Sequence, residues 1–305
     1  MSNETIVLGT RGSRLALYQA EQVARLLSAA HPRLSVRIQE IQTQGDRDRS
    51  RSLDSFRGVG VFVKELERAL TDQRIDAAVH SLKDMPTEVP SGLCIAAVPI
   101  REEWRDALCS ASGKPLGELR AGAKIATGSP RRAAQLLALR PDVEIVPIRG
   151  NVETRLRKMR EQGLDGVVLS YAGLLRLGLG EQVAEVFGPA DMLPAPGQGA
   201  IAVEARSDDS YALEALAAIR NERIERAVAA ERALLRRLGG GCHAAIGALA
   251  EIESGRLKLQ GGVGSPHGEG VVRAEATGDA GDPEALACLV ADKLLAQGAG
   301  DLLED

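Results

Sequence analysis

Short apolar runs alternate with amphipathic helical patterns along most of the chain. The runs are rich in small and β-branched residues, which is typical of buried strands, and the stretches between them repeat apolar residues at helical spacing. The predicted strands are 5–9, 34–41, 75–79, 93–99, 106–110, 123–126, 143–148, 166–169 and 200–205. The predicted helices are 14–29, 61–72, 131–139, 152–161, 172–177 and 211–219. This alternation predicts an α/β fold made of parallel β-α-β units.

The pattern changes after a Pro/Gly junction at 194–199. We expect strand 200–205 to return to the first sheet, so that two chain crossings form a hinge between domains. A long charged helix follows, then three strand patterns separated by turns, and then an amphipathic helix that closes the chain. These elements are 221–238, 246–252, 257–262, 271–276 and 283–295. The three strands predict a small antiparallel sheet.

The length of 305 residues suggests two or three domains, and we divide the predicted elements among three. Domain 1 comprises 1–99 and 200–220, and it includes a long polar loop at 43–60 that we interpret as a lid. Domain 2 comprises 100–199, and domain 3 comprises 221–305.

Composition excludes several functional classes. Apolar residues make up 44% and aromatic residues 2% of the chain, and the formal net charge is −4. These values argue against binding to nucleic acid or to an acidic membrane surface. The four cysteines show no CxxC spacing and the four histidines form no ligand cluster, so no metal site is predicted. No signal peptide or membrane span is recognised, and we expect a cytoplasmic protein.

The turn after strand 75–79 carries candidate chemistry. His80 ends the apolar pattern, Lys83 and Asp84 are adjacent opposite charges, and Pro86 prevents a longer helix. Open α/β sheets place their ligands outside the carboxyl ends of their strands. By themselves these residues favour a solvated turn that contains an ion pair.

Arginines gather at three predicted strand-to-helix turns. Seven of the 38 basic residues are lysines, which leaves 31 arginines. A helix N-terminus presents unpaired N–H groups, and an arginine beside it makes an anion site. The residues at these turns are Arg11 and Ser13; Ser129, Arg131 and Arg132; and Arg149, Asn151 and Arg155. They predict a ligand that carries several carboxylates or phosphates, and the absence of a phosphate-loop motif argues against a nucleotide. An acid such as Asp84 among them would serve a developing cation or a proton transfer.

Cys242 follows three glycines at the end of a basic helix. Such a turn leaves a thiol accessible, and Arg236, Arg237 and His243 favour the thiolate. The alternative is a small buried residue at a helix end. Cys94, Cys109 and Cys288 lie in apolar patterns and are expected in the core.

Together these motifs resemble the porphobilinogen deaminase family, also called hydroxymethylbilane synthases, along nearly the whole chain. The resemblance depends on their joint order. The motifs are Arg11-Gly-Ser13-Arg-Leu-Ala-Leu, Phe62-Val-Lys-Glu-Leu, His80-Ser-Leu-Lys83-Asp84-Met-Pro86, Arg131-Arg132, Arg149-Gly-Asn151-Val-Glu-Thr-Arg155-Leu, Ala172-Gly-Leu-Leu-Arg176-Leu-Gly178, Leu193-Pro-Ala-Pro-Gly-Gln-Gly199 and Gly240-Gly241-Cys242.

The resemblance implies two periplasmic-binding-protein-like domains joined by hinges and a small α+β domain. It also implies a transferase of tetrapyrrole synthesis that deaminates four porphobilinogen molecules, joins them to a dipyrromethane cofactor and releases linear hydroxymethylbilane. A thioether to Cys242 would hold this cofactor. The family is usually monomeric, and a tetrapyrrole-cyclising enzyme would act downstream.

The resemblance also assigns roles to individual residues. Asp84 is the catalytic carboxylate, which stabilises an azafulvene cation formed on loss of ammonia. The residues implied to hold cofactor acids are Lys83, Ser129, Arg131, Arg132 and Arg155. Those implied to serve the incoming substrate are Arg11, Ser13, Arg149 and Arg176, with Gln19 as a further candidate.

The chain departs from the family pattern at three places. Gly128 and Pro130 stand where the family has Ser and Leu, Val59 replaces a lid lysine, and Gly239 to Ala245 differ around Cys242. None of these changes removes a group that the chemistry requires.

Two alternative functions remain open. A two-domain solute-binding or effector-sensing protein for a polycarboxylate would need the arginine turns but neither Asp84 nor Cys242. A homologue that binds pyrroles without turnover is the other alternative.

Overall fold

The computed structural model describes residues 5–41, 63–239, 244–265, 268 and 270–304. The predicted lid at 43–60 and the predicted cofactor residue Cys242 lie outside the described residues. The chain divides into two compact units. Unit 1 contains residues 1–102 and 200–225, and unit 2 contains residues 103–199 and 226–305.

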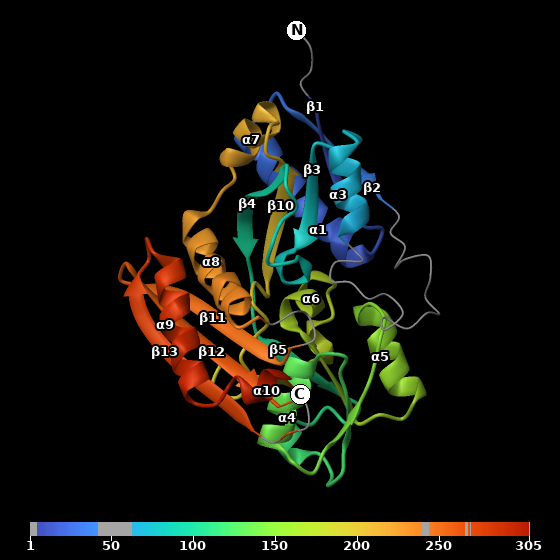
Figure 1. Ribbon diagram of the computed structural model, residues 1–305. Helices are drawn as coiled ribbons and strands as arrows, with labels where there is room; N and C mark the ends of the chain where they lie inside the picture. The colour runs from blue at the N-terminus through green and yellow to red at the C-terminus, as the bar shows by residue number, and fades with distance from the viewer. Residues whose placement is uncertain (1–4, 42–62, 240–243, 266–267, 269, 305) are drawn as a thin grey trace. The chain divides into compact units, whose positions relative to one another are not determined.

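Unit 1 is a five-stranded mixed sheet with helices packed against it (Figure 1). The strands, in spatial order, are β2 (Ser35–Glu40), β1 (Thr5–Thr10), β3 (Ala77–Ser81), β10 (Ala200–Arg206) and β4 (Leu93–Arg101). The helices are α1 (Arg14–Ala30), α3 (Lys64–Thr71) and α7 (Ser210–Ala217), and the 3-10 turn η2 (Leu82–Asp84) follows β3. The strand at 200–205 returns to this sheet as expected, and it inserts antiparallel between β3 and β4.

Unit 2 contains two sheets. The first orders its strands as β7 (Glu144–Val146), β6 (Lys124–Ala126), β8 (Gly166–Ser170), β5 (Asp106–Ser110) and β9 (Glu185–Val186). Its helices are α4 (Pro130–Leu139), α5 (Val152–Glu161) and α6 (Tyr171–Arg176), with 3-10 turns η3 (Leu116–Glu118) and η4 (Gly180–Gln182). The second sheet is antiparallel, with β11 (Ile246–Glu253), β12 (Arg256–Gly264) and β13 (Val271–Asp279) in that order.

The prediction of parallel units holds for β1, β2 and β3 and for β6, β7 and β8, but it is wrong for β5. Strand β5 pairs antiparallel with β8. The chain enters β5 directly from unit 1, and only parallel neighbours require a crossover between them. The sheets are therefore mixed, and the fold class is the predicted α/β class.

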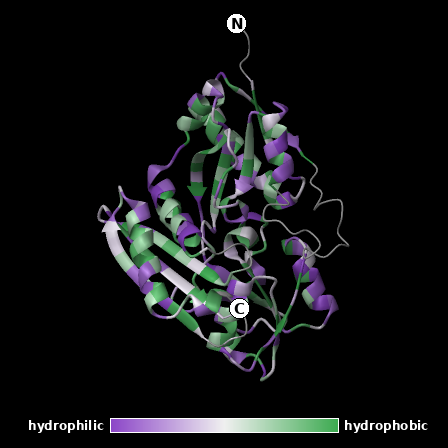
Figure 2. Cartoon of the chain, in the orientation of Figure 1, coloured by the Kyte–Doolittle hydropathy of each residue, from purple (hydrophilic) through white to green (hydrophobic). Residues whose placement is uncertain are grey.

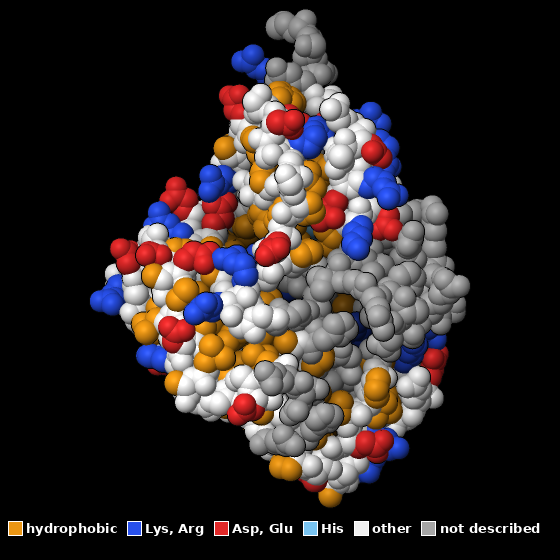
Figure 3. All heavy atoms as spheres, in the orientation of Figure 1, with side chains coloured by type: hydrophobic (Ala, Val, Ile, Leu, Met, Phe, Trp, Pro, Cys, Tyr) orange, Lys and Arg blue, Asp and Glu red, His pale blue; other side chains and the backbone are white. Residues whose placement is uncertain are grey.

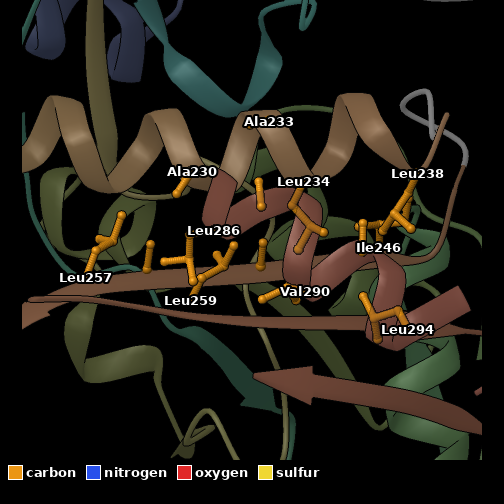
Figure 4. Packing of buried hydrophobic residues seen from close by; sticks show 14 of the residues in the cluster. Ala230, Ala233, Leu234, Leu238, Ile246, Leu257, Leu259, Leu286, Val290 and Leu294 are labelled. Atoms are coloured by element: carbon orange, nitrogen blue, oxygen red, sulfur yellow. The ribbon is translucent and has the colours of Figure 1, made fainter. Parts of the chain in front are cut away.

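A continuous apolar core lies between the second sheet of unit 2 and three helices, α8 (Glu222–Arg237), α9 (Pro283–Ala296) and α10 (Asp301–Glu304). Figure 4 shows leucines from α8 and α9 pointing toward Leu257 and Leu259 of β12. Gly261 allows this close packing, because a Cβ there would come within 2.6 Å of the Leu234 side chain. The core explains why α9 is apolar over most of its length.

The hydropathy of the residues agrees with their positions in the strands and helices. In Figure 2 the central strands of unit 1 are coloured mainly as hydrophobic, whereas the helices alternate between the two colours. On the face drawn in Figure 3, basic and acidic side chains of the described residues are interspersed. Among the described helices, none is both long enough and apolar enough to cross a membrane.

Truncation of Leu259 should test the importance of the second-sheet core. Leu259 is 0% exposed, and Leu259→Ala should lower the free energy of unfolding by about 3 kcal/mol, because it removes buried methyl groups and leaves a cavity. Leu289→Ala is the matched control, since Leu289 on α9 is 48% exposed. Urea unfolding of both variants measures the difference, and equal midpoints would contradict this account of the core.

Candidate active site

The end of β3 forms the first part of the site. The strand continues through His80 and Ser81 before the η2 turn begins at Leu82. The predicted strand end at residue 79 is therefore too early. His80 stays in the strand because its ring is buried and lies 3.0 Å from the Glu204 carboxylate of β10. Within the described residues, the other carboxylate oxygen of Glu204 is buried without a hydrogen-bond partner.

A second contact supports the same turn from α1. The Gln19 amide donates to Ser81 Oγ at 2.8 Å, and the Ser81 hydroxyl lies 3.2 Å from the Gln19 carbonyl oxygen. Gln19 is buried, so this pair occupies a protected position. The sequence interpretation gave Gln19 as a further candidate for substrate binding, and in the structure its amide is bonded to Ser81.

The parallel pairing of β1 and β3 brings two predicted turns to one edge of unit 1. Ser13 caps α1, where its hydroxyl accepts from Ala16 N at 3.3 Å, and Arg11 precedes it in the same turn. Lys83 and Asp84 follow β3 at this edge, with Lys83 half-buried and Asp84 exposed. The ends of β1 and β3 therefore carry Arg11, Lys83 and the accessible carboxylate of Asp84.

Unit 2 repeats this arrangement on three adjacent parallel strands, β7, β6 and β8. Side chains cap two helices here: Ser129 Oγ accepts from Arg132 N at 3.4 Å, and Asn151 Oδ1 accepts from Thr154 N at 2.8 Å. Arg149 is exposed beside the α5 cap. Two further arginines donate to backbone carbonyls. Arg155 Nε donates to Gly150 O at 2.7 Å, and Arg176 Nη2 donates to Gly199 O at 2.7 Å.

Arg131 and Arg132 surround the carboxylate of Asp106, the first residue of β5. Arg131 Nη1 donates to Asp106 Oδ2 at 2.6 Å, and Arg132 donates to Oδ1 from Nε at 2.9 Å and from Nη2 at 2.7 Å. Asp106 is 0% exposed, and the arginines are 4% and 5% exposed. Burial by itself would raise the pKa of Asp106, but the charges of both arginines and hydrogen bonds from Arg131 and Gln198 hold it well below 3.8.

This cluster fits an additional anionic group. Two guanidinium groups face one carboxylate, so the cluster carries one net positive charge. Arg131 Nε is buried and has no acceptor in the described part of the chain. A carboxylate of a dipyrromethane would supply both the charge and the acceptor, so Arg131 and Arg132 suit such a cofactor.

The presence of glycine at position 128, in the turn before α4, has a steric explanation. A Cβ at this position would lie 2.8 Å from the carbonyl oxygen of Ile148, so a side chain would force the backbone to move. Pro130 occupies the first turn of α4, where its missing N–H costs no hydrogen bond. Both departures from the family pattern are thus compatible with the Ser129 cap.

Three cysteines lie in the described residues. Burial raises the pKa of Cys109 to about 11 and also raises the pKa of Cys94, with Glu204 adding to the effect at Cys94. Cys288 is exposed on α9, so its predicted core position is wrong. Position 288 lies on the outer side of α9, beside the exposed Leu289, and a hydropathy pattern did not distinguish this side from the buried one.

Sequence reasoning missed the supporting polar residues Asp106, Gln135, Gln198 and Glu204. One signal was present, because a charged residue that opens an otherwise apolar strand, as Asp106 does, needs a partner when it is buried. No group of three or more His, Cys, Asp or Glu residues suited to a metal occurs in the segments that the structure describes.

The chain is thus a two-unit mixed α/β protein with arginines at the ends of its parallel strands. A family model described as "Porphobilinogen deaminase, dipyromethane cofactor binding domain" matches residues 6–214, and one described as "Porphobilinogen deaminase, C-terminal domain" matches residues 226–296. The chain belongs to the porphobilinogen deaminase family.

Two porphobilinogen deaminases are similar to this chain over nearly the full length of both sequences. The porphobilinogen deaminase of Desulforudis audaxviator is 50% identical over 298 residues, covering 98% of this chain and 96% of that protein. The porphobilinogen deaminase of Roseiflexus sp. is 47% identical over 300 residues, covering 98% and 99%. Among solved structures, the methionine-binding protein MetQ is similar with a TM-score of 0.45 at 14% identity, covering 76% of this chain and 96% of that one.

Ser81→Ala should test the support that α1 gives to the η2 turn. It leaves the buried Gln19 amide without the Ser81 hydroxyl and should reduce the free energy of unfolding by about 1–3 kcal/mol. Ser110→Ala is the control, because Ser110 also ends a strand but donates to Lys114 O at an exposed turn. Chemical denaturation compares the two, and an equal loss in both would refute a special role for the Gln19–Ser81 pair.

Proposed function

We propose that this chain deaminates four porphobilinogen molecules, joins them head-to-tail on a dipyrromethane primer and releases linear hydroxymethylbilane. The observation that carries the proposal is the buried Arg131–Arg132–Asp106 cluster, whose net positive charge requires an anion. Porphobilinogen and dipyrromethane carry acetate and propionate groups, which match such a site. The family membership selects this ligand class from the polyanions that the charges alone would permit.

The proposed ligand contacts divide between cofactor and substrate. Ser129, Arg131, Arg132, Arg155 and Lys83 would hold the acid groups of dipyrromethane. Arg11, Ser13, Arg149 and Arg176 would serve the acid groups of the incoming porphobilinogen. Arginine suits this work because its planar fork binds a carboxylate through two hydrogen bonds. We assign Gln19 to support of the Ser81 turn, because it is buried and already bonded there.

Asp84 would act on the reacting pyrrole. Loss of ammonia from an aminomethyl group leaves positive charge that a nearby carboxylate stabilises. Asp84 is exposed at the end of β3, where it can approach a ligand, and η2 holds it at a fixed position on the turn. The same carboxylate can accept the proton lost when the new bond forms.

Bound dipyrromethane supplies the free pyrrole carbon to which the first substrate is joined. We propose a thioether to Cys242 as its attachment. The raised pKa values of Cys94 and Cys109 disfavour the thiolate at both positions, which supports a thiol elsewhere in the chain.

The proposal extends to the organisation of the chain. We propose that the β11–β13 sheet, which has its own apolar core, forms a third domain beside the two larger ones. We also propose a cytoplasmic monomer whose product passes to a tetrapyrrole-cyclising enzyme. The solute-binding alternative uses the same arginines but gives Asp84 no task, and no specific contact favours it.

Intact-protein mass spectrometry should test the attachment. Protein purified from cells that make porphobilinogen should carry the extra mass of two linked pyrrole units. Cys242→Ser should abolish this addition, whereas the exposed Cys288→Ser should retain it. A bare wild-type polypeptide would overturn the proposed function, and an addition that survives Cys242→Ser would overturn the assigned cysteine.

Asp84→Asn should lower turnover by roughly 10²-fold, because the amide keeps the shape of the side chain but loses the charge that stabilises the cation. Glu88→Gln is the control, since Glu88 is another exposed carboxylate four residues along the same segment. Steady-state product formation measures both variants. Near-normal turnover of the Asp84 variant would remove it from the mechanism.

A further inference from the structure

Asp106 has an unusually complete set of hydrogen bonds for a buried carboxylate. Oδ1 accepts from Arg132 Nε and Nη2 and from Gln198 Nε2 at 2.9 Å, while Oδ2 accepts from Arg131 Nη1. These donors come from α4 and from the 194–199 junction. The orientation of both guanidinium groups is therefore determined at a single carboxylate.

A second set of contacts fixes Arg131 from the other side. Arg131 Nη1 also donates to Leu193 O at 2.6 Å. Gln135 holds the same backbone unit, because its amide donates to Leu193 O at 3.1 Å and accepts from Leu193 N at 2.8 Å. Arg273 of β13 adds a contact to Gln135 Oε1 at 3.2 Å. The second sheet of unit 2 thus takes part in the support of this arginine.

Gln198 connects Asp106 to backbone atoms near the points where the chain passes between the two units. Besides Asp106, its amide contacts Trp104 O at 2.8 Å and Arg105 O at 3.3 Å. The chain first enters unit 2 after residue 102 and leaves it after residue 199, so these atoms lie within a few residues of two of the three crossings. The same side chain therefore contacts the incoming segment and the anion cluster.

The charge balance distinguishes this cluster from an ordinary structural ion pair. One arginine would neutralise Asp106, but two surround it, and a buried charge without a counterion is costly. Arginine does not lose its proton to relieve that cost. The second guanidinium is thus held in the interior at a cost that binding of an anion would offset.

We propose that Asp106 is a positioning residue for the cofactor site: it orients Arg131 and Arg132 toward a carboxylate of dipyrromethane and cancels one of their two charges. Gln198 assists by holding Asp106 to the chain crossings. This inference rests on the proposed function. In this arrangement Asp106 sets the strength of anion binding, although its carboxylate does not itself touch the ligand.

Asp106→Asn tests the inference through cofactor loading and anion competition. The variant loses the charge that orders both arginines, so the fraction of chains with the two-pyrrole mass should fall about tenfold. The net charge of the cluster rises from one to two, so loading of cofactor-free chains supplied with porphobilinogen should be half-inhibited at about fivefold lower sulfate concentration. A purely structural role would not change sulfate sensitivity.

Asp165→Asn is the matched control, because Asp165 accepts two hydrogen bonds from Arg120 and one from Lys124 N at the opposite ends of β6 and β8. It should load and respond to sulfate as the wild type does. Gln198→Leu provides a second variant if Asp106→Asn does not fold. It should lower loading about threefold, while its sulfate sensitivity stays unchanged because no charge is removed.

The outcomes separate the two proposals. A wild-type protein without added mass refutes the proposed function. A loaded wild type together with normal loading and normal sulfate sensitivity in Asp106→Asn refutes the positioning role alone. If only Gln198→Leu can be purified, normal loading of that variant refutes the network that includes Asp106.

Discussion

The carboxylate of Asp106 between two buried arginines is the interaction on which the proposed cofactor site of unit 2 depends. Without it, Arg131 and Arg132 would bring two like charges into the interior with nothing to orient them. With it, they are fixed and one positive charge remains for a ligand. The apolar cores around β5, β6 and β8 make this charge effective, because the low dielectric of the interior strengthens its attraction for an anion.

In unit 1, too, buried polar contacts hold the strand end that carries a proposed site residue, although the groups differ. The His80–Glu204 contact ties β3 to β10, and the Gln19–Ser81 contact ties β3 to α1. Both lie within the last two residues of β3, immediately before the η2 turn. Buried polar contacts on two sides thus hold the backbone from which Asp84 emerges, while Asp84 itself stays accessible. In both units, rigid buried partners position the groups that are assigned to the ligand.

The sequence predicted most elements because each has a strong local signal. Strand β5 and helix α5 agree with their predicted bounds. Strand β9 was missed because two residues are too few to show a period. The antiparallel direction of β5 was missed because local pattern carries no information on strand pairing. The exposure of Cys288 was missed because α9 is apolar over most of its length.

The sequence by itself determined the α/β class, the strand-end turns and the family, since these depend on local periodicity, capping residues and the order of motifs. The tertiary structure alone decided which polar groups support those turns. Asp106 and Arg131 are 25 residues apart, and His80 and Glu204 are 124 apart. Their contacts exist because the sheet pairs distant strands and excludes water between them. Only then does burial make an internal partner necessary for each charge, as it does for Asp106.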